Sequence, residues 1–451
     1  MFGKLLIALT AFSAGIASHI AWKKHPKRGE SPQPDRDAPL PDAEVDAVVN
    51  AVISTADPYA EYPAEVRETV AQLEEFFASH ELPLRSPIQY EEGVNLTRYI
   101  LFPGKECAIE RFTELEADLS LALSADILMQ PLCGKDRALT MDIPHTTRET
   151  ASLADLLTSE TAMQSVKPLE FPLGVGFGKR IQLCNLAAMP HLLIAGAMGS
   201  GKTECLHSML LSLACKNSPA DLRLVLLDPG NAEYTPYADL PHLYTPVVTD
   251  TARAIAVLLA LVGEMERRCA LLRDVGVRDV EGYNQSVQGD PSYEHLPRIV
   301  VCVEEYAALI LAWPNKTPER LLIRLAQKGR PAGLHLVVAT QHLTPDILTG
   351  RLKNNMLSRI AFALGGTEES YLILDANGAE SLLGQGDMLY KPTGCAQPMR
   401  LQGACVKESE IVQHAEALKG RHPPVRYNRA FLEIVEEELT HLPTDPEDEE
   451  E

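Results

Sequence analysis

The stretch HLLIAGAMGSGKTECLHSMLLSLAC, from His191 to Cys215, decides the fold. Its centre, Gly196–Thr203, matches the pattern GxxxxGK[ST], in which glycines let backbone N–H groups curl around a polyphosphate. The apolar run His191–Ala195 predicts a buried strand before this loop, and the periodic apolar residues after it predict a helix. A strand, a glycine-rich loop and a helix in this order are the context that a nucleotide-binding phosphate loop requires.

The residues of this loop are the predicted nucleotide-binding set: Gly196, Ala197, Met198, Gly199, Ser200, Gly201, Lys202 and Thr203. We expect Lys202 to reach the β- and γ-phosphates of ATP and the Thr203 hydroxyl to ligate Mg²⁺. The competing interpretation is a chance glycine-rich turn, and the predicted strand and helix on either side argue against it.

A second buried strand leads into two carboxylates. The run Arg298–Val303 (RIVVCV) is followed directly by Glu304 and Glu305. We expect Glu304 to hold the shell of the Mg²⁺ ion and Glu305 to orient or deprotonate the attacking water. Adjacent strand residues point to opposite sides, so only one of the two can face the metal directly. Two solvated acids at a strand end are the alternative.

A third strand, LHLVVAT, is followed directly by Gln341. A polar side chain at the tip of a neighbouring strand can contact the γ-phosphate, so Gln341 is a candidate sensor of hydrolysis; otherwise it is an ordinary polar strand end. Short apolar runs alternate with amphipathic helices over this region, and they predict an α/β fold with a mainly parallel sheet. The runs are His191–Ala195, Leu222–Leu227, Arg298–Val303 and Leu334–Ala339.

Composition excludes some classes of protein. With 45% hydrophobic and 23% charged residues, the 451-residue chain is not wholly disordered, and its length predicts two or three domains. The formal charge of −21 argues at first against a nucleic-acid partner. However, residues 431–451 hold ten carboxylates and no Lys or Arg, and the middle of the chain is nearly neutral. The nine scattered cysteines and thirteen histidines predict free thiols and no transition-metal site.

The N-terminus holds one apolar run of membrane length. Leu5–Trp22 would span about 27 Å as a helix, and it is followed by Lys23, Lys24, Lys27 and Arg28. This basic cluster would keep the following chain in the cytoplasm. The alternative is a cleaved signal peptide. We favour a single-pass anchor, because export would separate a nucleotide-binding domain from ATP.

Residues 172–406 resemble the motor domain of the FtsK/SpoIIIE DNA translocases. The resemblance rests on MPHLLIAGAMGSGKTECLHSMLLSL, LLDPGNAEYTPYADLPHLYTPVVTDTARAIAVL, GEMERRCALLRDVGVRDVEGYN, LIRLAQKGRPAGLHLVVATQHLTPDILTGRLKNNMLSRIAF and DANGAESLLGQGDMLY. Weaker similarity to the α subdomain of the family reaches back to about Glu91, through VNLTRYILFPG and ADLSLALSADILMQPLCGKDRALTMDIP.

The resemblance implies a RecA-like P-loop ATPase that forms a hexameric ring around double-stranded DNA and moves it by hydrolysing ATP at subunit interfaces. Arg330, in QKGRPAGLH, occupies the position of a conserved family arginine and is the implied arginine finger. Its alternative role is a surface salt bridge. The implied contacts to DNA phosphates are Arg351, Lys353 and Arg359, which could also be ordinary surface charges.

We therefore predict five segments: a transmembrane anchor with its basic flank (1–29), a linker (30–63), a small α+β domain (64–163), a RecA-like motor (164–422) and an acidic disordered tail (423–451). About 45 residues follow Val406, so no C-terminal winged-helix module is expected. The expected location is the bacterial inner membrane, with the motor in the cytoplasm.

The chain departs from the family pattern at several positions. Glu304 stands where the family has Asp, and His342 where it usually has Arg. Thr367 and Tyr371 align with family positions that carry Lys and Arg, and each lost cation weakens the grip on phosphates.

Three hypotheses result. The first is a membrane-tethered, ATP-driven translocase of double-stranded DNA, acting in DNA transfer or segregation. The second, motivated by the lost basic positions and the predicted anchor, is a related ring ATPase that moves proteins through a secretion apparatus. The third, suggested by Glu304 alone, is a non-hydrolysing scaffold.

Overall fold

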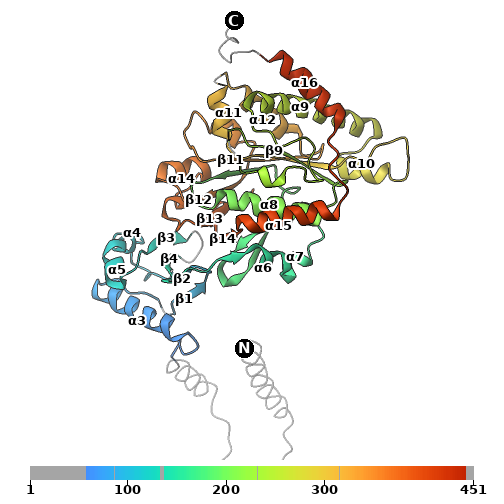
Figure 1. Cartoon of the computed structure of the whole chain (residues 1–451). Helices are drawn as coiled ribbons and strands as arrows, with labels where there is room; N and C mark the ends of the chain where they lie inside the picture. The colour runs from blue at the N-terminus through green and yellow to red at the C-terminus, as the bar shows by residue number, and fades with distance from the viewer. Residues whose placement is uncertain (1–56, 86, 133–136, 231, 314, 443–451) are drawn as a thin grey trace, which may run out of the picture. The chain divides into compact units, whose positions relative to one another are not determined.

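The structure is a computed structural model, and it describes residues 57–85, 87–132, 137–230, 232–313 and 315–442 (Figure 1). The chain divides into two compact units at Pro63 and Ala64. The predicted membrane segment Leu5–Trp22 lies outside the described residues. Within those that are described, no helix has both the length and the apolar character needed to cross a bilayer.

A four-stranded antiparallel sheet opens the second unit. Its strands lie in the order β1-β2-β4-β3. Helix α3 (Ala64–Ser79) buries Val66, Val70, Leu73 and Phe77, which recur at helical spacing. The ring of Phe77 packs 5.0 Å from that of Phe112 in α4, between centroids. The remaining bounds are β1 (Gln89–Glu92), β2 (Leu96–Leu101), α4 (Glu110–Thr113), α5 (Glu116–Leu123), β3 (Leu128–Leu132) and β4 (Ala138–Pro144).

A ten-stranded mixed sheet forms the core of the rest. Its order is β7-β6-β14-β13-β12-β8-β11-β10-β9, and the short β5 pairs with β14. Neighbours from β12 to β9 are parallel, and those from β7 to β12 are antiparallel, which confirms the predicted α/β class. The bounds are β5 (Ala151–Ser152), β6 (Glu170–Val175), β7 (Ile181–Asn185), β8 (Leu192–Ala195), β9 (Leu222–Leu227), β10 (Arg298–Val303), β11 (Leu334–Thr340), β12 (Ser358–Phe362), β13 (Asp387–Lys391) and β14 (Met399–Cys405).

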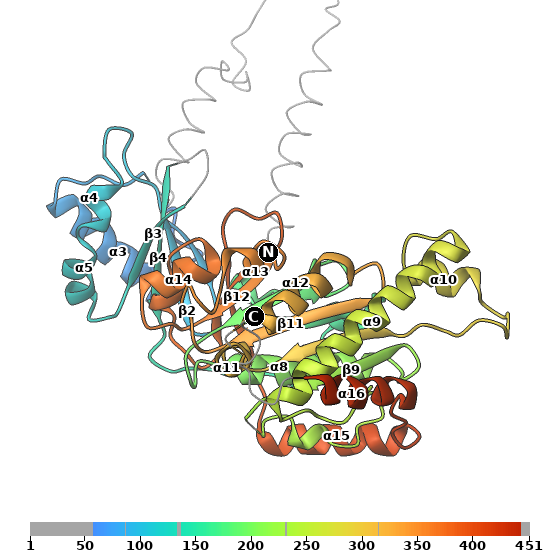
Figure 2. The same cartoon turned by 90° about the horizontal axis from the view of Figure 1, so that it is seen from above.

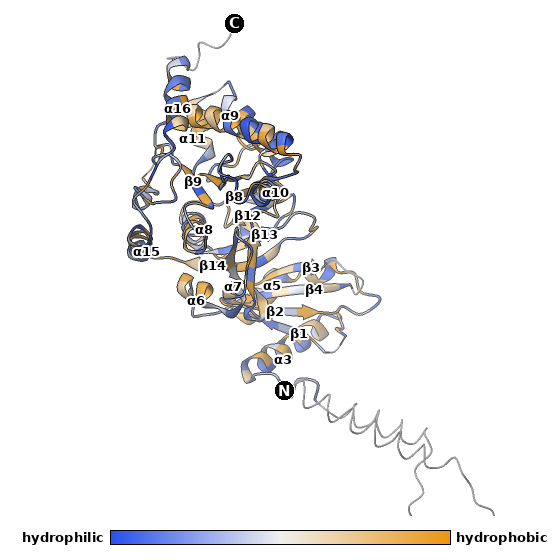
Figure 3. Cartoon of the chain, turned by 90° about the vertical axis from the view of Figure 1, so that its right-hand side faces the viewer, coloured by the Kyte–Doolittle hydropathy of each residue, from blue (hydrophilic) through white to orange (hydrophobic). Residues whose placement is uncertain are grey.

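Helices cover both faces of this sheet (Figures 1 and 2). Leu193 and Ala195 of β8 face the core under α9, α11, α12 and α16, whereas Leu192 and Ile194 face the core under α8 and α15. The ribbons of α9 and α16 alternate between apolar and polar colouring, as amphipathic helices do (Figure 3). The bounds are α6 (Leu153–Thr158), α7 (Glu160–Met163), α8 (Lys202–Lys216), α9 (Thr251–Val275), α10 (Val280–Ser286), α11 (Tyr306–Ala312), α12 (Thr317–Lys328), α13 (Gly350–Lys353), α14 (Thr367–Leu374), α15 (Glu408–Arg421) and α16 (Arg429–His441).

The prediction of a disordered tail from residue 423 was wrong for residues 429–441, which are helical. Residues 429–441 form α16, which packs on α9. Phe431 and Val435, four residues apart, are 3% and 0% exposed, and the Asn428 side chain caps the helix by accepting from the Phe431 N–H. The carboxylates lie on the outer face of this helix, so a solvated acidic face coexists with a buried apolar stripe.

The change from the small sheet to the large one comes earlier than the predicted boundary at residue 163. Strand β5 pairs with β14, and α6 packs against β6 and β14. Residues from Ala151 onward therefore belong with the larger sheet.

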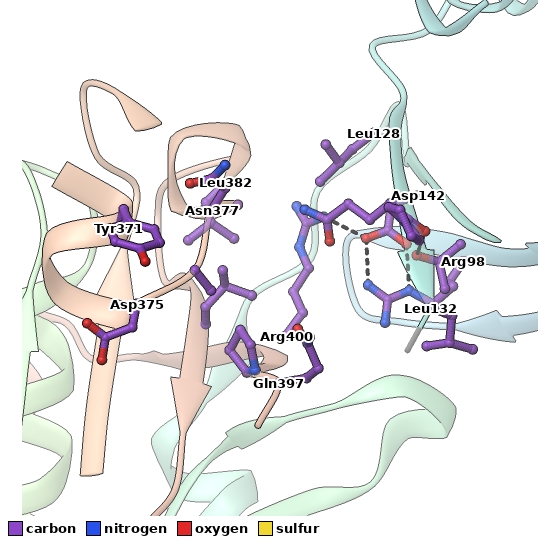
Figure 4. A pocket seen from close by; sticks show the side chains of 17 residues that line it. Arg98, Leu128, Leu132, Asp142, Tyr371, Asp375, Asn377, Leu382, Gln397 and Arg400 are labelled. Carbon is purple, nitrogen blue, oxygen red and sulfur yellow. Dashed lines mark hydrogen bonds and ion pairs between the residues drawn. The ribbon is translucent and has the colours of Figure 1, made fainter. Parts of the chain in front are cut away.

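A buried ionic network joins the two sheets. Arg400 on β14 donates to Asp142 on β4 (2.8 Å) and to Asp387 at the start of β13 (2.7 Å). Arg98 on β2 also donates to Asp142 (2.6 Å). Asp142, Arg98 and Arg400 line one wall of a pocket of about 520 Å³ between the sheets (Figure 4).

A second chain of hydrogen bonds leads from the small sheet to the predicted phosphate loop. The Asn95 side-chain amide donates to Gln402 Oε1 (2.9 Å), and Gln402 Nε2 donates to the Gln385 carbonyl (2.9 Å). The next residue, Gly386, donates its N–H to the Ser200 carbonyl (2.9 Å). The loop before β13 therefore contacts both the small sheet and the phosphate loop.

Candidate nucleotide site

The site forms where four parallel strands end at one edge of the sheet. β8 leads into the phosphate loop, β10 into Glu304 and Glu305, and β11 into Gln341. β9 leads into Asp228. Parallel strands have their carboxyl ends on the same edge, and ligands of open α/β sheets bind at that edge.

The phosphate loop has the tight backbone that its glycines predict. Gly199 and Gly201 have φ angles of 72° and 111°, in the region that favours glycine. A Cβ on Gly201 would also lie only 2.5 Å from the Gly386 nitrogen. Helix α8 begins at Lys202, so its first N–H groups lie at the end of the loop. Loop and helix together form a cradle for an anion.

Lys202 and Thr203 converge on one oxygen of Glu304. Lys202 Nζ lies 2.8 Å from Glu304 Oε1, and the Thr203 hydroxyl donates to the same oxygen at 3.0 Å. Burial raises the pKa of Glu304, and the adjacent Lys202 ammonium opposes this shift. The structure thus brings together three residues that the sequence predicts to act on one nucleotide.

The second oxygen of Glu304 accepts no hydrogen bond from the part of the chain that the structure describes, although it is fully buried. A buried carboxylate oxygen beside a threonine hydroxyl is the kind of hard-oxygen donor set that Mg²⁺ prefers. Thr203 and Glu304 therefore fit the predicted magnesium site.

Glu305 is held from three sides. Its Oε1 accepts from the Thr340 hydroxyl (2.6 Å) and from the Ala307 N–H (3.1 Å), and its Oε2 accepts from the Gln341 N–H (2.8 Å). The side chain is 8% exposed and caps the start of α11. The predicted base and the predicted sensor are thus in direct contact, through the backbone of Gln341 rather than through its side chain.

Arg330 lies near the amino ends of the parallel strands, whereas the candidate nucleotide site lies at their carboxyl ends. Arg330 is exposed, it precedes β11, and its Nε donates to the Ala187 carbonyl at 3.2 Å. The seven residues of β11 separate Arg330 by about 23 Å from the carboxyl ends of the strands, where the phosphate loop lies. Arg330 lines a pocket of about 290 Å³ together with Arg278, Arg298 and His335. Arg330 therefore cannot reach a phosphate bound at the phosphate loop of its own chain.

The three predicted DNA contacts differ in their surroundings. Arg351 is exposed on α13. Lys353 donates to Asp375 at 2.9 Å, and Arg359, only 5% exposed, donates to the same carboxylate and to three backbone carbonyls. Partial burial alone would raise the pKa of Asp375, but the hydrogen bonds from these two cations lower it overall. In this fold Arg359 is a structural cation, Lys353 is partly buried and paired, and Arg351 is the one of the three that is classed as exposed.

Residues 152–345 match the FtsK/SpoIIIE family. The chain is 37% identical over 350 residues to the DNA translocase FtsK of Clostridium acetobutylicum, an alignment that covers 77% of this chain and 46% of the relative. This chain carries an FtsK/SpoIIIE-family domain. It is also 37% identical over 370 residues to the DNA translocase SftA of Bacillus subtilis, covering 80% of this chain and 39% of that protein. The chain thus spans about half or less of the length of these curated relatives.

The FtsK/SpoIIIE-family domain also resembles a solved structure. The pCW3 conjugation coupling protein TcpA, solved as a monomer with ATPγS, aligns with a TM-score of 0.55 and 21% identity over 79% of this chain and all of that one. At this identity the likeness concerns the fold alone.

The sequence reasoning missed two residues of the site. Asp228 is 0% exposed, accepts from the Tyr234 N–H (3.2 Å) and adds its charge beside Glu304. It is the first acid after the strand Leu222–Leu227, which was the available signal. Thr340 carries no comparable signal in the sequence, because threonine is common in strands.

Proposed function

We propose that this chain is an ATP-hydrolysing translocase of double-stranded DNA with a RecA-like motor. The observation that carries the proposal is the convergence of Lys202 and Thr203 on Glu304, with Glu305 next to it. This arrangement lies in a chain that is 37% identical, over 350 and 370 residues, to two named DNA translocases. The parallel strand order β12-β8-β11-β10-β9 supports the RecA-like assignment.

Each residue of the site has a role in this proposal. The phosphate loop holds the β- and γ-phosphates through its backbone N–H groups, and Lys202 neutralises their charge. Thr203 and Glu304 would hold Mg²⁺, which would supply positive charge beside the phosphate oxygens. Glu305 orients the attacking water and accepts its proton, and Gln341 senses the γ-phosphate. Three hydrogen bonds, from Thr340, Ala307 and Gln341, fix the orientation of the Glu305 carboxylate in the described arrangement.

We further propose a ring, a hexamer as the family resemblance implies. Arg330 lies near the amino ends of the strands, away from the phosphate loop of its own chain. It can therefore stabilise the transferring phosphoryl group only on a neighbouring subunit. Arg351 contacts DNA phosphates. Leu5–Trp22 tethers the ring to the inner membrane, with the motor in the cytoplasm.

The decisive measurement is ATP turnover by the full chain with and without duplex DNA, across a salt series. We expect duplex DNA to stimulate turnover and salt to weaken the stimulation, because phosphate contacts release counterions. Lys202→Ala should abolish turnover, while Lys328→Ala, a matched change at an exposed lysine of α12, should not. Turnover that is the same with and without DNA at low salt would reject the DNA substrate.

The second candidate function is a ring ATPase that moves polypeptides. It is favoured by one observation: Lys353 and Arg359 pair with Asp375, which leaves less free positive charge for DNA. A polypeptide that stimulates turnover, together with no retention of duplex DNA on the protein, would support it over the first.

A further inference from the structure

Thr340 lies between the proposed base and the loop that follows β11. It is the last residue of β11 and is 0% exposed. Its Oγ1 lies 2.6 Å from Glu305 Oε1 and 3.2 Å from the His342 carbonyl oxygen. A threonine hydroxyl has a single proton to donate, so it can serve only one of these two acceptors at a time.

The end of β11 supplies most of what holds Glu305. Two of its three hydrogen bonds come from consecutive residues, Thr340 and Gln341, and the third comes from Ala307 in its own helix. No Lys or Arg among the described residues forms an ion pair with Glu305. Movement of the β11 end would therefore change the surroundings of this carboxylate more than movement of any other described element.

We propose that Thr340 is a positioning residue that restrains Glu305 and releases it when the loop at Gln341 and His342 changes conformation. The proposal rests on the ATPase function proposed above. In the restrained arrangement the hydroxyl donates to Glu305 Oε1. In the released arrangement it rotates, keeps its proton, and donates to the His342 carbonyl. Glu305 Oε1 then has a free lone pair for the attacking water.

The path from this loop to the proposed substrate contact is short. Eleven positions after Thr340 the chain reaches Arg351, which is exposed on α13. Between them Leu343, Ile347 and Leu348 are buried in the core that also contains β11. A substrate held by Arg351 can therefore act on the β11 end through a packed segment, and Thr340 transfers the change to the base.

The test uses the full chain and two substitutions of nearly equal size. Thr340→Val removes the hydroxyl and keeps the shape, whereas Thr340→Ser keeps the hydroxyl. The matched control is Thr140→Val, since Thr140 is also a buried strand threonine (6% exposed) whose hydroxyl donates to a carbonyl, that of Gln130, far from the site. The readouts are turnover number and KM for ATP, each with and without duplex DNA, and the affinity for a fluorescent ATP analogue.

We expect Thr340→Val to raise DNA-free turnover about fivefold, to lower the stimulation ratio by the same factor and to leave KM and analogue affinity unchanged. Thr340→Ser and Thr140→Val should behave like the unchanged chain. If Thr340→Val fails to fold, Thr340→Cys, whose thiol is a weak donor, should show a smaller rise.

Equal DNA-free turnover in Thr340→Val and Thr340→Ser would overturn the proposal, and so would an equal loss of turnover in both conditions. If the protein without substitutions hydrolyses ATP but does not respond to DNA, only the DNA substrate is rejected. The DNA-free turnover of the Thr340 variants still tests the role of Thr340. Absence of turnover in the unchanged chain would reject the ATPase function and the Thr340 proposal with it.

Discussion

Lys202 Nζ lies 2.8 Å from Glu304 Oε1, and each side chain is only 2% exposed. One oxygen of the Glu304 side chain contacts both Lys202 and Thr203. The buried charges of Lys202 and Glu304 therefore compensate each other, so the stability of the fold depends on the pair.

The first prediction concerns this ion pair. Lys202→Met leaves Glu304 buried without its cation, and we expect the free energy of unfolding to fall by about 3 kcal/mol. Adding Glu304→Leu should recover most of that loss, because a buried apolar pair is often as stable as the ion pair that it replaces. Urea unfolding of the two single variants and the double variant measures this. A loss of unfolding free energy in the double variant equal to the sum of the two single losses would contradict coupling between Lys202 and Glu304.

The second prediction concerns Arg330. Arg330→Ala and Lys202→Ala should each abolish ATP turnover, but only Lys202→Ala should weaken ATP binding. Mixing the two variants should restore part of the activity, because a Lys202→Ala subunit still offers its Arg330 to the intact phosphate loop of a neighbour. Turnover across a series of mixing ratios checks this. A mixture as inactive as its components would argue against action between subunits.

The third prediction concerns α16. Phe431 packs with its ring 4.9 Å from that of Tyr244. Phe431→Ala should lower the free energy of unfolding by about 3 kcal/mol and expose the C-terminal helix to proteases. Ile434, 45% exposed on the same helix, offers the matched control, and Ile434→Ala should change stability little. Chemical unfolding and limited proteolysis report both effects.

The fourth prediction concerns pH. Burial lowers the pKa of His207 to about 4, and its ring stacks on Tyr237 at 5.6 Å between centroids. The unfolded chain binds this proton near pH 6.5 and the folded chain only near pH 4, so stability falls as the pH drops through that window, by up to about 3 kcal/mol from this residue. His207→Phe keeps a stacked ring and should reduce the slope. Unfolding midpoints at pH 7, 6, 5 and 4 measure it.

Local signals in the sequence predicted much of the site. The glycine loop, its strand and its helix are contiguous, so Gly196–Thr203 could be placed without knowing the rest of the fold. Glu304 and Glu305 follow an apolar run that can only be a buried strand. These features depend on residues close together in the chain, where periodicity and turn chemistry are informative.

Other features depend on contacts between distant residues. The pairing of Arg359 with Asp375 needs β12 and the end of α14 to be adjacent, which no spacing reveals. The many carboxylates after Arg429 are typical of a solvated tail, and they outweighed the helical spacing of Phe431 and Val435. The role of Thr340 depends on the distance between the ends of two strands, and a sequence alone does not give that distance.

The place of β8 in the sheet has a consequence for the biosynthesis of the chain. Its two neighbours are β11 and β12, and Leu334 at the start of β11 is translated about 140 residues after Ala195. At a synthesis rate of about 5 to 20 residues per second, the apolar strand LLIA stays without its neighbouring strands for roughly 7 to 28 s. During that time the phosphate loop that follows it is not held by the sheet, and the nascent chain exposes an unpaired apolar strand. The strand ends that form the proposed nucleotide site are incomplete until Thr340 has been added, when more than two thirds of the chain has been synthesised.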